Sequence, residues 1–142
     1  MPRKNGKRVV GIGGIFFRAK DPKALSDWYS KRLGLRIKDN VALFTWNSRK
    51  NPKRIGYSVW ALFSKDDPYF GSKKSQFMIN YRVNNLSSLL ARLRKEGVRV
   101  ARKAEKSPYG KFGWVYDPEG NRIELWEPPR AYKAPEDEMA SE

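Results

Sequence analysis

Alternating hydrophobic and polar side chains predict a β-hairpin near the end of the chain. Its strands, residues 110–116 and 122–126, flank a turn at 117–121 in which a proline fixes φ at about −65° and a glycine accepts a positive φ. Because side chains alternate along a strand, Glu124 and Trp126 share one face, and the aliphatic residues beside them share the other. An acidic residue on the same face as a tryptophan makes this hairpin a candidate site.

The same kind of pattern predicts the other elements, and their order occurs twice. Apolar residues at helical spacing predict one helix that begins at Asp21 and ends at Gly34, and another that begins at Asn85 and ends at Gly97. The predicted strands are residues 9–19, 35–37, 41–46 and 55–63 in the first half, and 77–83, 98–100, 110–116 and 122–126 in the second. This repetition predicts two βαβββ modules.

Two such modules placed edge to edge predict an α+β fold: a curved eight-stranded mixed sheet around a cleft, with the helices on its outer face. We expect one domain, made of module one at 9–63, a linker at 64–76 and module two at 77–129, so that it spans residues 9–129. A basic, disordered segment at 1–8 and an acidic tail at 130–142 flank it. In the linker, Tyr69 and Phe70 are expected to fold back, either as a lid or plug or as a local hydrophobic contact.

Glycines at positions 11, 13 and 14 interrupt the first predicted strand. A phosphate-binding loop follows a strand and opens a helix. These glycines lie inside the strand, so we interpret them as a bulge or a close approach of another backbone.

Strand alternation predicts which side chains line the cleft. A concave surface with aromatic walls and a few converging polar groups is typical of a small-molecule site. In the alternative, the aromatic side chains simply fill the concavity and the arginines lie at its rim. The predicted ligand-binding residues are Phe16, Arg18, Trp60, Asn80, Arg82, Trp114, Glu124 and Trp126.

Composition narrows the chemistry. The 142 residues include no cysteine and no histidine, which removes thiolate chemistry, the commonest metal ligand and the commonest general base. The formal net charge of +15 permits an anionic small molecule or nucleic acid as partner, although the basic residues are spread over the chain rather than gathered in one stripe. We expect no membrane segment, a cytoplasmic location, and a homodimer that covers the sheet edges.

The chain resembles the glyoxalase, bleomycin-resistance and extradiol-dioxygenase group, the vicinal oxygen chelate superfamily. The resemblance spans about residues 9–129 and is carried by motifs at 16–22, 27–35, 80–86 and, above all, 117–125. It implies a divalent metal held by inward side chains. The positions that match the family's metal ligands are Gly14, Ser58, Met78 and Glu124.

Of these four residues only Glu124 is a competent ligand, so we expect neither metal nor cofactor; a divalent metal at Glu124 is the alternative. Glu124 is also the only candidate catalytic residue. It could form a salt bridge with Arg18 or Arg82, receive a cationic or hydroxyl group of a ligand, or act as a metal-free general base.

Three functions remain open from the sequence. The first is a protein that binds a small neutral or anionic, aromatic molecule in the cleft without the family metal, in the manner of resistance proteins or carriers. The second is a metal-dependent lyase, isomerase or dioxygenase, as the resemblance implies. The third is a basic module associated with nucleic acid.

Overall fold

The computed structural model describes residues 8–47, 49, 51–53 and 55–129. The predicted N-terminal segment, except Arg8, and the predicted acidic tail therefore lie outside the described residues. The described residues divide into two compact units, and we call residues 8–13 with 78–129 the C-terminal unit and residues 14–77 the N-terminal unit.

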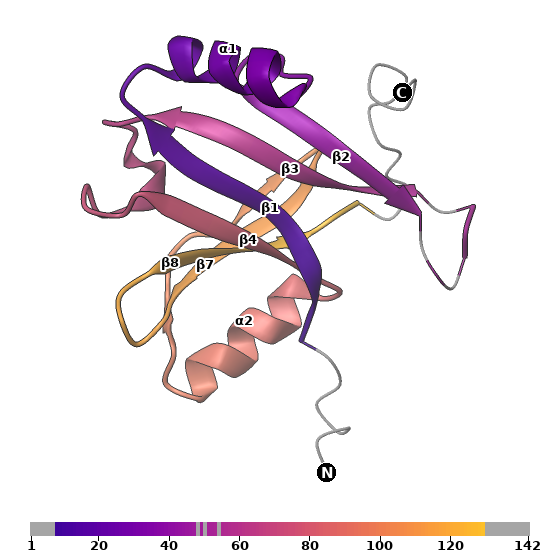
Figure 1. Cartoon of the computed structure of the whole chain (residues 1–142). Coiled ribbons are helices and arrows are strands. Elements are labelled where there is room, and N and C mark those ends of the chain that lie inside the picture. The colour runs from indigo at the N-terminus through magenta and orange to yellow at the C-terminus, as the bar shows by residue number, and fades with distance from the viewer. Residues whose placement is uncertain (1–7, 48, 50, 54, 130–142) are drawn as a thin grey trace. The chain divides into compact units, whose positions relative to one another are not determined.

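The α+β class and the eight-stranded mixed sheet are confirmed (Figure 1). The main strand order is β2-β3-β1-β4-β8-β7-β5, and β6 pairs with β7. Among the described residues, no helix is long and apolar enough to cross a membrane. The elements are β1 (Val9–Ala19), α1 (Pro22–Leu33), β2 (Val41–Asn47), β3 (Ile55–Ser64), the 3-10 turn η2 (Pro68–Phe70), β4 (Phe77–Val83), α2 (Leu86–Lys95), β5 (Arg99–Val100), β6 (Glu105–Ser107), β7 (Gly110–Tyr116) and β8 (Arg122–Glu127).

In the N-terminal unit, α1 begins and ends where the sequence predicts. The Asp21 carboxylate accepts a hydrogen bond from the Ala24 backbone N–H at 3.1 Å, and Gly34 ends the helix with a φ of 72°. The expected apolar stripe is only partly covered, because no α1 side chain is fully buried and Trp28 is 50% exposed. Tyr29 makes the main ring contacts of this helix with the sheet.

The short strand predicted at residues 35–37 is wrong. The chain reverses there instead, through two backbone hydrogen bonds between Lys38 and Val41 of 2.9 and 3.0 Å. Asp39 and Asn40 adopt positive φ values of 51° and 66°, which these residue types tolerate better than most. Because this tight turn leads directly into β2, the first module has one strand fewer than expected.

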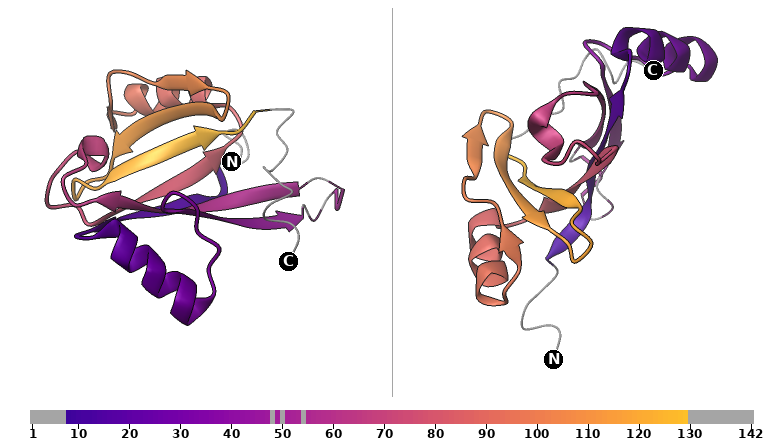
Figure 2. Two further views of the ribbon diagram at one scale, coloured as in Figure 1. Left: turned by 90° about the horizontal axis from the view of Figure 1, so that it is seen from above. Right: turned by 90° about the vertical axis from the view of Figure 1, so that its left-hand side faces the viewer.

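In the C-terminal unit, α2 covers one face of β7 and β8 (Figure 2). Its N-cap is Asn85, whose side chain accepts a hydrogen bond from the Ser88 backbone N–H at 3.1 Å. The core beneath the helix is formed by Val83, Leu86, Leu89, Leu90, Val115 and Leu125. Tyr81 of β4 and Leu93 of α2 pack against this core.

Two short elements differ from the prediction for the second module. The second strand of this module, β5, is limited to Arg99–Val100, and an additional strand, β6, pairs with the start of β7. The three residues of β6 are polar and exposed, so no hydrophobic alternation marks them in the sequence.

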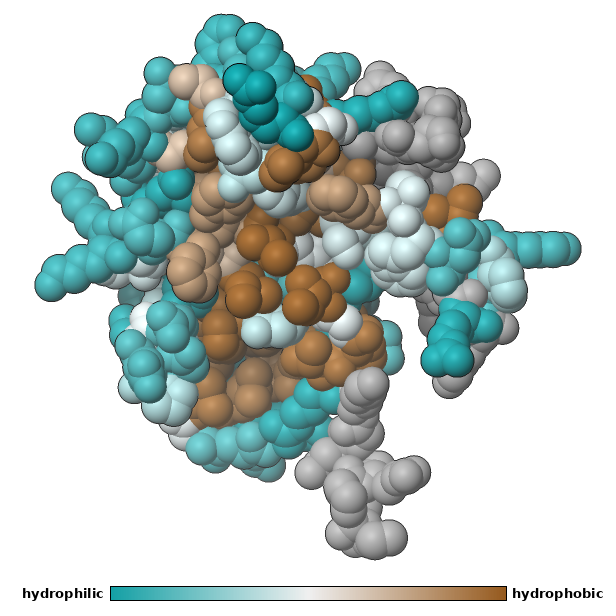
Figure 3. Space-filling view, viewed as in Figure 1, coloured by the Kyte–Doolittle hydropathy of each residue, from teal (hydrophilic) through white to brown (hydrophobic). Residues whose placement is uncertain are grey.

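β1 contributes residues 9–13 to the C-terminal unit and residues 14–19 to the N-terminal unit. It also exposes apolar side chains, including Ile12 and Ile15, and Figure 3 shows hydrophobic surface along this strand.

Candidate functional site

The centre of the C-terminal unit is a buried hydrogen-bonded cluster around Glu124, which is only 1% exposed. Asn80 Nδ2 donates to Glu124 Oε1 at 2.6 Å, and Trp114 Nε1 donates to Glu124 Oε2 at 2.9 Å. The sheet register produces this arrangement, since Asn80 on β4 and Trp114 on β7 are the direct cross-strand neighbours of Glu124 on β8. Glu124 is therefore held by two neutral N–H donors, a pairing that the sequence did not predict.

Aromatic and cationic side chains extend the cluster along the same face of the sheet. The Arg82 guanidinium lies 5.3 Å from the centroid of the Trp126 ring, and Phe112 stacks on Trp126 with ring centroids 6.2 Å apart. Trp126 Nε1 donates to the Tyr109 carbonyl at 2.8 Å, which fixes the ring. Five of the eight predicted binding residues thus lie in this unit and share one face: Asn80, Arg82, Trp114, Glu124 and Trp126.

Of the β1 glycines, Gly14 shows the predicted close approach of another backbone, since a Cβ there would lie 2.8 Å from the Val59 carbonyl oxygen. Gly13 is instead approached by side chains of the cluster. A Cβ atom at this position would lie 2.2 Å from Asn80 Oδ1 and 2.8 Å from Trp126 Cε3. Only glycine leaves room for the amide that donates to Glu124. Asn80 Oδ1 itself is buried and has no hydrogen-bond partner among the described residues.

The residues that match the family's metal positions do not form a fitting donor set. Both carboxylate oxygens of Glu124 already accept N–H groups, and Met78 offers only a buried thioether, a poor ligand for hard or borderline divalent ions. Within the described part of the chain, no three histidine, cysteine, aspartate or glutamate residues come together as a metal site.

A second row of side chains, which sequence reasoning did not select as a site, crosses three strands of the C-terminal unit. Arg99, Tyr116 and Arg122 are direct neighbours on β5, β7 and β8. The Arg99 guanidinium lies 4.1 Å from the Tyr116 ring centroid, and Arg122 donates to the Tyr116 hydroxyl. Arg122 also lies 5.2 Å from the Trp114 ring centroid, so it links this row to the cluster. Tyr116 and Arg122 flank the predicted turn, whereas the pairing of Arg99 with Tyr116 is revealed only by the strand register.

In the N-terminal unit, Arg18 organises the linker. Its side chain is 8% exposed and donates to the backbone carbonyls of Lys65, Ser72 (2.9 Å) and Ser75 (2.7 Å). The guanidinium also lies 4.9 Å from the Phe70 ring centroid. Arg18 therefore holds the linker in place, and its donors are directed to backbone oxygens.

The two linker aromatics fold back within their own unit. Phe70 is fully buried, 5.2 Å from the Phe63 ring centroid, and Tyr69 stacks on Phe63 at 5.4 Å. This arrangement matches the local hydrophobic contact that the sequence left open as one of two alternatives.

The predicted face is right for Phe16 and wrong for Trp60. Trp60 packs against Phe17 (5.4 Å) and Tyr29 (4.9 Å), on the face that α1 covers. The parallel register pairs Ile15 with Trp60 and Phe16 with Ala61, so Phe16 points to the opposite face. A register error of one residue moves a side chain to the other side of the sheet, which is the physical reason for the misplacement.

Comparison with known proteins supports the fold. The model of the Glyoxalase/Bleomycin resistance protein/Dioxygenase superfamily matches residues 11–125. No curated protein matches. Methylmalonyl-CoA epimerase from Mycobacterium tuberculosis is 20% identical, with a TM-score of 0.60 over 87% of this chain and 91% of that one.

Two further solved structures share the fold. A Streptomyces coelicolor methylmalonyl-CoA epimerase variant, in complex with 2-nitronate-propionyl-CoA, is 16% identical, with a TM-score of 0.62 over 88% of this chain and 99% of that one. The Mn(II)-bound glyoxalase from Novosphingobium aromaticivorans is 20% identical, with a TM-score of 0.55 over 84% of this chain and 39% of that one. At these identities the likeness concerns the fold alone, while the match of the family model covers most of the chain. The chain belongs to the Glyoxalase/Bleomycin resistance protein/Dioxygenase superfamily.

Proposed function

We propose that the protein binds a small neutral or anionic molecule with an aromatic portion, and that it does so without the metal its family uses. The observation that carries the proposal is the occupation of both Glu124 oxygens by Asn80 and Trp114. A carboxylate held in this way acts as a fixed structural acceptor. It keeps the amide and the indole in place behind the half-buried side chains of the same face, Arg82 and Phe112.

Energetics favour this role over metal binding. Hydrogen bonds to a charged group each contribute about 1.5–3 kcal/mol, so withdrawing Glu124 from both donors costs about 3–6 kcal/mol. A metal would have to offset that cost with a single carboxylate, whereas structural and catalytic sites normally provide three or four protein ligands. The donor set therefore favours metal-free binding over the alternative, a metal-dependent lyase, isomerase or dioxygenase.

The net charge of the protein and the aromatic side chains of the cluster indicate the class of ligand. With 30 lysine and arginine residues against 15 acidic ones, the protein repels cations at a distance. The Arg82 guanidinium lies over the Trp126 ring on this face, and we expect it to bind a carbonyl or carboxylate oxygen of the ligand. Flat rings stack well on Phe112, which already lies parallel to Trp126 within 9°.

Metal content and ligand contact can be tested on the same preparation. The protein is soaked with nickel, zinc, manganese and iron salts, desalted, and analysed for metal. We expect amounts well below one per chain, and no rise in melting temperature, since a bound metal would stabilise the folded state. Stoichiometric metal that disappears in Glu124→Gln would overturn the proposal.

Ligand binding is followed through the indole N–H signals of Trp114 and Trp126 in ¹H–¹⁵N spectra. Each N–H has its own acceptor, Glu124 for Trp114 and the Tyr109 carbonyl for Trp126, so the two signals report on the cluster. Titration with a panel of aromatic carboxylates and amides should shift both. Arg82→Met should weaken the binding of carboxylates more than the binding of amides, because it removes a charge and keeps an apolar side chain. A panel that leaves both signals unmoved at millimolar concentrations would contradict the proposal.

A further inference from the structure

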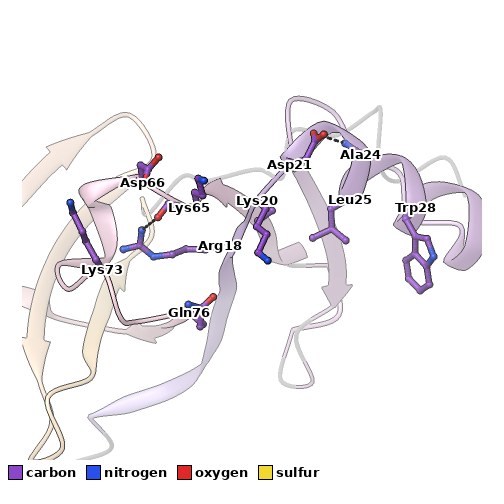
Figure 4. A pocket seen from close by; sticks show the side chains of 11 residues that line it. Arg18, Lys20, Asp21, Ala24, Leu25, Trp28, Lys65, Asp66, Lys73 and Gln76 are labelled. Atoms are coloured by element: carbon purple, nitrogen blue, oxygen red, sulfur yellow. Dashed lines mark hydrogen bonds between the residues drawn. The ribbon is translucent and has the colours of Figure 1, made fainter.

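A groove separate from the Glu124 cluster lies within the N-terminal unit, between the end of β1, the first turns of α1 and the linker (Figure 4). Its volume of about 760 Å³ is within the range of small-molecule sites, roughly 300–1,000 Å³. The lining residues are Arg18, Ala19, Lys20, Asp21, Ala24, Leu25, Trp28, Lys65, Asp66, Lys73 and Gln76.

The walls of the groove are held by contacts that do not depend on a ligand. Arg18 ties β1 to the linker through three carbonyls, and the buried Phe70 anchors the linker beneath. On the other side, Asp21 caps α1 through the Ala24 N–H. The groove is therefore formed before a ligand arrives, which lowers the cost of ordering on binding.

The two ends of the groove differ in chemistry. Lys65 and Lys73 reach it from the linker, and Lys20 lies between them and the helix; all three side chains are exposed. At the α1 end lie Leu25 and Trp28, and Trp28 is 50% exposed. A groove with ammonium groups toward one end and an indole at the other matches a molecule with an anionic head and a flat apolar body.

The acidic side chains in the lining reduce this positive charge only in part. Asp21, which keeps its negative charge while it caps α1, and Asp66 are the two carboxylates of the lining, against the three ammonium groups of Lys20, Lys65 and Lys73. Arg18 adds a fourth cation, but its donors point to the linker backbone. The groove therefore keeps an excess of positive charge near the linker.

We propose that this groove is a binding site for a small aromatic carboxylate. The carboxylate is held among Lys20, Lys65 and Lys73, and the ring lies against Leu25 and Trp28. The site uses none of the residues of the Glu124 cluster, so it stands or falls independently of the function proposed above.

The experiment uses the full chain and 1-naphthoate as the probe, followed by ¹H–¹⁵N spectra in low salt. The neutral isostere 1-naphthalenemethanol and inorganic phosphate are titrated in parallel. Naphthoate should shift the Trp28 indole N–H, assigned with Trp28→Phe, and the backbone signals of residues 18–28 and 65–76. The alcohol and phosphate should bind more weakly, because each offers only one half of the complementary chemistry.

A double variant tests the charged end. Exposed ion pairs contribute about 0.2–1 kcal/mol each, so Lys65→Ala with Lys73→Ala should weaken naphthoate binding about two- to thirtyfold. Lys103→Ala with Lys106→Ala is the matched control: both lysines are exposed, lie in the other unit, and change the net charge equally. This control should bind naphthoate as the unaltered protein does.

Several results would overturn the proposal. Equal weakening by both double variants would show that only the net charge matters. Equal affinities for the alcohol and naphthoate would show that the carboxylate does not contribute to binding. Equal affinities for phosphate and naphthoate would show that the aromatic ring does not contribute. Shifts confined to the Trp114 and Trp126 indoles would place the probe at the Glu124 cluster, which would support the proposed function and reject this site.

Discussion

Replacing Gly13 with alanine is the sharpest test of the cluster's geometry. The new Cβ would lie 2.2 Å from Asn80 Oδ1, 2.8 Å from Trp126 Cε3 and 3.1 Å from Arg82 Cγ. Contacts this short cannot persist, so a neighbour must move. Asn80 is the nearest, and its amide cannot retreat without leaving Glu124, to which it donates at 2.6 Å.

The cost has two parts. Overpacking a well-filled interior costs about 1–3 kcal/mol, and losing a hydrogen bond to a charged acceptor costs about 1.5–3 kcal/mol. We expect Gly13→Ala to lower the free energy of unfolding by about 3–5 kcal/mol. For a chain of this size, that is a fall in melting temperature of about 10–20 °C.

A matched control lies two residues away on the same strand. A Cβ at Gly11 would meet only Arg82 Cδ at 3.8 Å, an ordinary contact, and neither glycine has a positive φ. Gly11→Ala should therefore change stability by less than about 1 kcal/mol, and it can even stabilise by restricting the unfolded chain. Urea unfolding monitored by tryptophan fluorescence measures both variants. Equal stabilities for Gly11→Ala and Gly13→Ala would refute the close approach and the geometry around Asn80.

Three further predictions concern single side chains. Glu124→Gln should lower the free energy of unfolding much less than Glu124→Ala does. With glutamine, the Asn80 amide can flip so that its Oδ1 accepts a hydrogen bond from the glutamine NH₂. Alanine leaves the buried donors unpaired and should cost about 3–5 kcal/mol, as measured by urea unfolding. Arg18→Met keeps an apolar stem but removes the donors to three carbonyls, so amide exchange of residues 65–75 should accelerate while that of α2 stays unchanged. The Asn121 side chain, followed by backbone N–H groups, lowers the pKa of Asp117, so Asn121→Ala should raise that pKa in an NMR titration. A carboxyl with a lowered folded-state pKa stabilises the protein above its unfolded-state pKa and loses this contribution as the pH falls through the folded-state value, so the variant should lose its turn at a higher pH.

Much of the fold was predictable because local chemistry marks it. Asp21, Gly34 and Asn85 are cap residues whose role depends on neighbours within four positions, and each cap lies where expected. The Asp117 turn is equally local, with its carboxylate accepting N–H groups of residues 119 and 121. β6 and the reversal at Lys38 escaped prediction, because neither carries an apolar alternation.

Of the site, the sequence could predict only which side chains share a face of the sheet, because side chains alternate along each strand. Parity placed Asn80, Trp114 and Glu124 on one face, and their cross-strand register then made them direct neighbours. Trp60 failed at the same step, since a parallel pair far apart in sequence leaves its register open by one residue. Register between distant strands depends on tertiary packing, which local patterns do not encode.

The role of Glu124 as a hydrogen-bond acceptor could not be predicted from the sequence for the same reason. In sequence, a carboxylate that binds a metal and one that accepts two N–H groups look alike, since both require an inward acid on a closing strand. The two cases differ in the chemistry of the cross-strand neighbours. Imidazoles or further acids favour the binding of a metal cation, whereas an amide and an indole donate N–H hydrogen bonds to the carboxylate. Asn80 and Trp114 are of the second kind, and Gly13 leaves the space that the amide needs. The acid is thus defined by its neighbours across the sheet, and the proposed metal-free binding role follows from their donors rather than from the carboxylate itself.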